Sequence, residues 1–260
     1  MTKNNKYFGI SIVVVVITTI HLCSTNFIDK KNDDYQFPCG VAPSQINSFS
    51  IDTSNKKRLV FNPPFRWKKN ILKVHFTDIN NFDLKEKTLN LANEWSKSAK
   101  IKFILSADIS ESDIRVSFKE SRGYMSAIGN SANRKSYDGK ATLWLQDLDT
   151  RTNNEFRRVV LHEFGHAIGL EHELQSPNSN IQWDTAKVYT YYKSTYDWSP
   201  QMVNDFVLKK INTGEYTRFD TNSIMIYAVP AFLTKNHQEI SWPENLSFLD
   251  KKTIKKYYPF

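Results

Sequence analysis

The stretch that most constrains this chain runs from His162 to His172 and reads HEFGHAIGLEH. If it is helical, His162 and His166 stand one turn apart and present their imidazoles to the same metal ion, while Glu163 faces the neighbouring space. Gly169 then offers a position where the helix can end and turn, which brings in His172 as a third nitrogen ligand. Three protein ligands leave one position on a zinc ion open, as in catalytic zinc sites.

The pattern therefore predicts one catalytic Zn²⁺ ion and no other cofactor. Water in the open position has its pKa lowered to about 7 and becomes a nucleophile, with Glu163 as its general base. A surface pair of histidines at helical spacing is the ordinary alternative, but the extension through Gly169 to His172 argues against chance. The other histidines lie far apart in sequence and are interpreted as a leader residue (His21), a strand residue (His75) and a loop residue (His237).

With 260 residues, the chain has room for one catalytic domain of about 200 residues and a lead-in. Its start is typical of an export signal, because Lys3 and Lys6 precede an apolar run over residues 8–20. The predicted segments are a signal peptide or lipoprotein leader (1–25), a linker or short pro-segment (26–62) and a zinc metalloprotease catalytic domain (63–260). We expect a secreted or cell-envelope protein.

The two cysteines, Cys23 and Cys39, both precede the predicted catalytic domain. Cys23 stands where a bacterial lipoprotein carries its acylated cysteine, so membrane attachment through the leader or through Cys23 is one alternative. Residues 38–43 read PCGVAP and resemble the inhibitory cysteine segment of matrixin propeptides. The other interpretation of Cys39 is a free thiol in a linker.

The net charge of +8 comes from lysines scattered along the chain, without arginine–aromatic interleaving. This favours a basic solvated surface and predicts no nucleic-acid partner.

The periodicity predicts an α+β chain. Strands are expected at 71–76, 101–105, 113–118 and 141–146. Helices are expected from Asp83, where Glu86 makes a capping-box pattern, over 153–169, and from the capping pair Ser247 and Asp250 to about 257. The Tyr-rich stretch 184–198 has only weak periodicity, so this half is expected to be irregular.

Further segments carry a resemblance to a known family. Residues 223–227 read SIMIY and are similar to the Met-turn of metzincins, and Glu173, QSP at 175–177, IQWD at 181–184 and RW at 66–67 are similar to astacins. The chain thus resembles metzincin zinc metalloproteases, in a bacterial astacin-like or matrixin-like branch.

The resemblance implies the metzincin fold: an N-terminal twisted mixed sheet with two long helices, and an irregular C-terminal subdomain with a closing helix. It implies that Met225 forms a hydrophobic floor beneath the zinc. Tyr227 would join as a further ligand or donate a hydrogen bond to the reacting oxyanion; the alternative is a plain core tyrosine. It also implies that strand 141–146 is a sheet edge to which an extended peptide substrate adds.

The expected function is a secreted or surface-attached zinc-dependent endopeptidase that acts on protein or peptide substrates. The alternative is a zinc-bearing adhesin or binding protein of metzincin fold without proteolytic activity, against which the intact Glu163 argues. A second alternative is a thermolysin-type protease, in which the third zinc ligand is a distant Glu. That ligand is not needed here, because His172 supplies the third position.

Overall fold

The computed structural model describes residues 40–41, 61–212 and 214–260. Within these ranges, six strands form one mixed sheet in the order β1-β5-β6-β4-β2-β3. The strands are β1 (Gly40–Val41), β2 (Ile71–Phe76), β3 (Lys102–Leu105), β4 (Ile114–Ser117), β5 (Tyr124–Ser126) and β6 (Leu143–Leu145). The predicted leader, Cys23, Cys39 and nearly all of the predicted linker lie outside the described residues.

The sheet is parallel except at one end. Strands β3, β2, β4 and β6 run parallel, whereas β5 is antiparallel to β6 and β1 is parallel to β5. Side chains of β2 alternate as expected, with Leu72, Val74 and Phe76 buried. The four predicted strands are all present.

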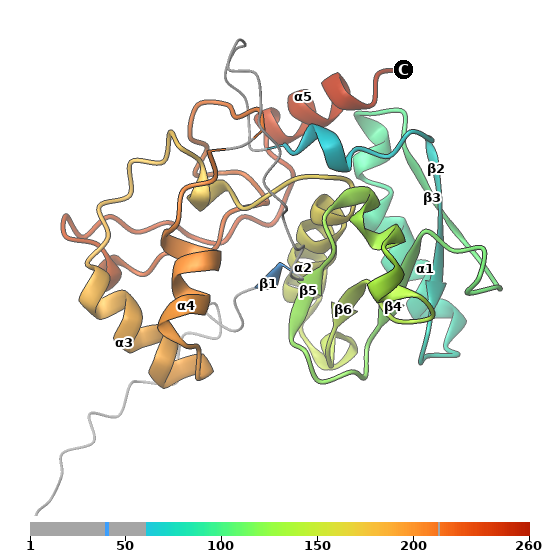
Figure 1. The fold of residues 1–260 in the computed structure, drawn as a ribbon, viewed down its shortest axis with the longest axis horizontal. Helices are drawn as coiled ribbons and strands as arrows, with labels where there is room; N and C mark the ends of the chain where they lie inside the picture. The colour runs from blue at the N-terminus through green and yellow to red at the C-terminus, as the bar shows by residue number, and fades with distance from the viewer. Residues whose placement is uncertain (1–39, 42–60, 213) are drawn as a thin grey trace, which may run out of the picture. The chain divides into compact units, whose positions relative to one another are not determined.

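Two helices cover the sheet (Figure 1): α1 (Phe82–Ala92) contacts β3, and α2 (Asn153–Ala167) contacts β5, β6 and α1. Aromatic side chains pack between the helices and the sheet. Phe103 of β3 contacts Phe164 of α2 edge to face, with ring centroids 4.9 Å apart. Trp95, in the 3-10 helix η3 (Trp95–Lys97), donates its indole N–H to the carbonyl of Leu161 at 3.0 Å. The helix that carries the histidines is therefore fixed to the core along its length.

The second half of the chain has its own core. This half contains α3 (Thr185–Tyr196), α4 (Pro200–Val203), the π-helix η8 (Asn204–Leu208) and the closing helix α5 (Phe248–Tyr257). The second core takes residues from α3, α4 and η8, whereas Ile254 and Tyr257 of α5 belong to the first core. The remaining 3-10 helices are η2 (Pro63–Phe65), η4 (Gly129–Asn133), η5 (Lys135–Tyr137), η6 (Leu148–Thr150), η7 (Glu173–Gln175) and η9 (Ala231–Leu233). Residues 223–227 lie between the two cores, because Ile224 and Met225 belong to the first and Ile226 and Tyr227 to the second.

The α+β fold is confirmed, with three corrections. Strand β6 is not an edge, because the chain turns at Gly123 (φ +69°) and returns as β5 on its outer side. Helix α1 begins at Phe82, with Asn81 and not Asp83 as the N-cap that accepts from the Leu84 N–H. The stretch expected to be irregular is helical over α3, which Asp184 caps.

Candidate metal centre

Helix α2 places the first two histidines. The Thr152 side chain accepts from the Glu155 N–H at 3.3 Å and caps the helix, which ends at Ala167. His162 and His166 lie one turn apart and are buried, with their Nε2 atoms 3.2 Å apart. The predicted helical geometry of the motif is confirmed.

A tight turn after α2 brings in the third histidine. Gly169 has φ +107°, a conformation that favours glycine, and a Cβ there would also meet the ring of Phe61 at 2.9 Å. The carbonyls at the helix end accept from donors outside the motif: the Trp67 indole to Ala167 (2.8 Å), the Tyr258 hydroxyl to Ile168 (3.0 Å) and the Asn62 N–H to Gly169 (3.1 Å). The turn is thus held by both ends of the described domain.

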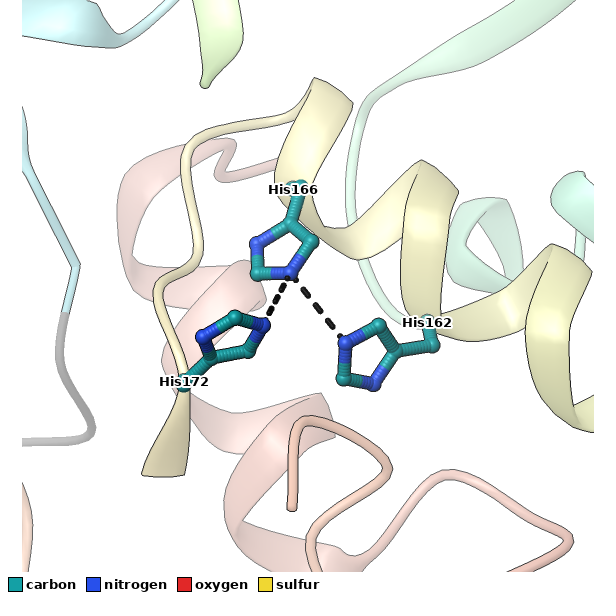
Figure 2. Close-up of side chains that lie close together, drawn as sticks. All are labelled: His162, His166 and His172. Carbon is teal, nitrogen blue, oxygen red and sulfur yellow. Dashed lines mark hydrogen bonds between the residues drawn. The ribbon is translucent and has the colours of Figure 1, made fainter. Parts of the chain in front are cut away.

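The three imidazoles converge on one point (Figure 2). His172 Nε2 lies 3.0 Å from His166 Nε2, and the nitrogens of His162, His166 and His172 that could bind a metal all lie within 4.8 Å of one another. All three side chains are buried. His75 lies in β2 and His237 lies outside the helices and strands, as the sequence predicted.

The outer ring nitrogens determine what the inner ones can do. His162 Nδ1 lies 2.7 Å from the Ile224 carbonyl and His166 Nδ1 lies 2.7 Å from the Leu170 carbonyl. A carbonyl oxygen only accepts, so these Nδ1 atoms carry the hydrogen and the Nε2 atoms carry lone pairs.

Burial keeps the histidines neutral. It lowers the pKa of His162 to about 4, and it lowers the pKa of His166 and His172 well below their usual value. His162 and His166 aim lone pairs at each other, an arrangement that repels unless a cation lies between them, and neutral nitrogen donors of this kind suit zinc. The residues present therefore fit one zinc ion.

The segment 223–227 lies against this cluster. The Asp250 carboxylate accepts from the Ser223 hydroxyl at 2.6 Å and from the Ile224 N–H at 2.8 Å, and the Met225 carbonyl accepts from the Glu173 N–H at 2.9 Å. The sequence predicted Asp250 only as a helix cap, a role it has through Ser247. It also fixes the backbone whose carbonyl orients His162.

The two predicted catalytic side chains belong to the same region. Tyr227 is 3% exposed and its hydroxyl lies 2.7 Å from His172 Nε2. Its ring centroid lies 4.5 Å from that of His172. Glu163 follows His162 on α2 and is 1% exposed. The fold therefore brings Tyr227 to the point where the imidazoles converge, and it buries Glu163 beside a proposed ligand.

Comparisons with known proteins agree with this geometry. Residues 60–259 match the family model described as Astacin, a peptidase family. The zinc metalloproteinase nas-36 of Haemonchus contortus is 27% identical over 202 residues, which are 72% of this chain and 30% of that protein. The chain thus spans less than a third of the length of that curated relative.

The chain is also similar to solved structures. A structure of myroilysin is 32% identical, covers 77% of this chain and 98% of its own, and superposes with a TM-score of 0.71. High choriolytic enzyme 1, a hatching-enzyme zinc-protease of Oryzias latipes, is 16% identical, covers 75% of this chain and 95% of its own, and has a TM-score of 0.51, which is a likeness of fold.

Proposed function

The chain belongs to the astacin family of zinc metalloendopeptidases, and from this premise we propose that it cleaves internal peptide bonds at the site of His162, His166 and His172. One observation carries the proposal. The three buried imidazoles aim their Nε2 atoms at a common point, while carbonyl oxygens fix the Nδ1 atoms of the first two.

Each side chain has a proposed role. His162, His166 and His172 hold the zinc ion, which when bound polarises the scissile carbonyl and lowers the pKa of water to about 7. Glu163 accepts the proton of the attacking water and passes it to the leaving amine. No covalent intermediate with the protein is required.

Tyr227 has two proposed roles that the same contact supports. Its hydroxyl lies 2.7 Å from His172 Nε2, beside the point where the imidazoles converge. From there it can donate a hydrogen bond to the oxyanion that develops on the scissile carbonyl. The same position would allow it to serve as a further zinc ligand. In both roles the hydroxyl, and not only the ring, is required for full activity.

We also propose how a substrate lies at the sheet edge. An extended peptide takes the place of β1 beside β5, where the backbone of Gly40–Val41 pairs with Met125 and Ser126. This pairing supports the view that the outer side of β5 accepts a peptide backbone. The partner is therefore a protein or peptide chain.

Export is proposed from the sequence of residues 1–25, with membrane attachment through this leader or through Cys23 as an alternative. These residues lie outside the part of the chain that the structure describes. Among the described residues, the helices are too short or too polar to cross a membrane.

The test is digestion of a peptide library by the full-length chain, with the products read by mass spectrometry. We expect internal cleavage that a chelator abolishes and added zinc restores. Stoichiometric zinc binding without cleavage of any peptide would instead favour the zinc-bearing adhesin or binding protein. Cleavage unaffected by the chelator would contradict the metal site.

A further inference from the structure

Gln175 is a buried side chain next to the third histidine that the mechanism above does not use. It lies at the end of η7 and is 3% exposed. Its Oε1 atom lies 3.4 Å from His172 Nδ1, and its Nε2 atom donates to the carbonyls of Asp205 at 2.8 Å and Lys209 at 2.9 Å. All three polar contacts of the amide are therefore inside the protein.

These contacts determine which way the amide points. The carbonyl oxygens of Asp205 and Lys209 only accept hydrogen bonds, so the NH₂ group of Gln175 must face them. The amide oxygen is then left facing His172 Nδ1, and it too only accepts. His172 must therefore carry its hydrogen on Nδ1.

The consequence lies on the other side of the imidazole ring. With the hydrogen on Nδ1, His172 Nε2 has a lone pair, and this atom faces His166 Nε2 at 3.0 Å and the Tyr227 hydroxyl at 2.7 Å. The Tyr227 hydroxyl also lies 3.4 Å from His172 Nδ1, but its shorter contact is with Nε2, to which it can donate. Gln175 and Tyr227 are therefore consistent with the same tautomer, and the facing lone pairs of His166 and His172 require a cation between them.

His172 differs from the other two histidines in this respect. His162 and His166 are oriented by backbone carbonyls, whereas the acceptor for His172 is a side chain that a substitution can remove. That side chain is in turn held by the π-helix η8, whose last turn closes where Lys209 N–H donates to the Asn204 carbonyl at 2.8 Å. π-helical turns are rare and often lie at functional sites.

We propose that Gln175 is a positioning residue that fixes the tautomer and direction of His172, and thereby links the π-helix to the metal centre. The inference rests on the proposed three-histidine zinc site. Substitution of a residue that hydrogen-bonds a metal-bound histidine commonly weakens metal affinity by about 10- to 100-fold. The same range is expected for loss of the Gln175 oxygen.

Two substitutions separate positioning from a merely structural role. Gln175→Met keeps the length of the side chain and removes every hydrogen bond. Gln175→Glu keeps an oxygen that accepts from His172 Nδ1 but loses the two donations to Asp205 and Lys209. Gln201→Met is the matched control. Gln201 also donates to Asp205, but to a carboxylate oxygen of its side chain at 2.8 Å, and Gln201 is exposed.

The zinc affinity of each full-length variant is measured by competition with a chromophoric chelator. We expect zinc binding about 10- to 100-fold weaker in Gln175→Met, near wild type in Gln201→Met, and clearly stronger in Gln175→Glu than in Gln175→Met. Zinc affinity in Gln175→Met within about threefold of wild type would overturn the proposal. So would a Glu variant as weak as the Met variant, because lost support of the π-helix would then be the whole effect.

A second readout does not depend on zinc. ¹⁵N–¹H correlation spectra of the zinc-free protein report which ring nitrogen of His172 is protonated. We expect Nδ1 in wild type and in Gln175→Glu, and a mixture of tautomers in Gln175→Met. Protonation on Nε2 in wild type would overturn the inference about Gln175. Correct tautomers in a wild-type protein that binds no zinc would instead contradict the proposed function alone.

Discussion

Gly165 of α2 lies so close to Met225 that a Cβ atom built on the glycine would be 2.4 Å from the methionine Sδ. The same Cβ would lie 3.1 Å from the ring of Trp95. Gly165 immediately precedes His166, so the helix approaches residues 223–227 at the turn that carries a proposed zinc ligand. The contact explains why a glycine, otherwise unfavourable in a helix, stands there.

The first prediction is that Gly165→Ala destabilises the protein, although the same change in an exposed helix usually stabilises it. Overpacking costs about 1–3 kcal/mol, so the free energy of unfolding of the zinc-free protein should fall by that amount. Chemical denaturation measures it. Combining the change with Met225→Ala should recover part of the loss, and strict additivity of the two substitutions would contradict the proposed clash.

Glu163→Gln should leave zinc content and fold intact and remove peptide cleavage. The amide has nearly the same shape as the carboxylate but cannot accept the proton of the attacking water. Metal content and peptide turnover are measured on the same preparation. Full turnover would reject Glu163 as the base, and loss of metal would assign it a structural role.

Tyr227→Phe removes one hydroxyl and leaves the ring to pack in the second core. If the hydroxyl stabilises the developing oxyanion, kcat should fall by about 10- to 1000-fold with KM little changed. Tyr192→Phe is the control, because Tyr192 is a buried tyrosine of α3 in the same core. Equal losses in kcat for the two variants would leave Tyr227 as a packing residue.

The fold was predictable where the local pattern is long. Six alternating residues identify β2, and the capping pair Ser247 and Asp250 identifies α5. Strand β5 was missed because three residues carry no period. Helix α3 was missed because only Val188 and Tyr192 are fully buried, while Tyr189, Tyr191 and Tyr196 are partly buried around them and blur the apolar face.

The candidate site divides in the same way. The three histidines lie within one short stretch, so helical spacing and one glycine were enough to predict that their side chains lie close together. The carbonyl that orients His162 belongs to the distant Ile224, and the groups that hold this backbone and the turn after α2 are distant too, as where Asp250 accepts from the Ile224 N–H or Trp67 donates to the Ala167 carbonyl. Such contacts depend on tertiary structure, and periodicity carries no information about them.

Asp250 also makes the stability of the folded protein depend on pH. Burial is the largest cause that raises its pKa from the usual 3.8 to about 6, although the hydroxyl of Ser223 and the N–H groups of Ile224 and Ser247 favour the charged form. The folded protein therefore holds this proton more tightly than the unfolded chain does. The stability that Asp250 contributes is complete below about pH 4 and is lost as the pH rises through about 6.

The last prediction compares wild type with Asp250→Asn by chemical denaturation of the zinc-free protein between about pH 4 and pH 7. Asn cannot lose a proton, so the free energy of unfolding of wild type should fall relative to the variant by about 2–3 kcal/mol across this range. Burial also raises the pKa of Glu171, to about 7, and this contribution cancels in the difference because Glu171 is present in both proteins. Burial raises the pKa of Glu173 as well, and the Asp250 charge adds to that rise, so the difference also contains this repulsion, which acts in the same direction as the pH rises. A difference between wild type and variant that is constant with pH, or that grows in favour of wild type as the pH rises, would mean that Asp250 is already ionised in the folded protein and holds residues 223–224 as a carboxylate.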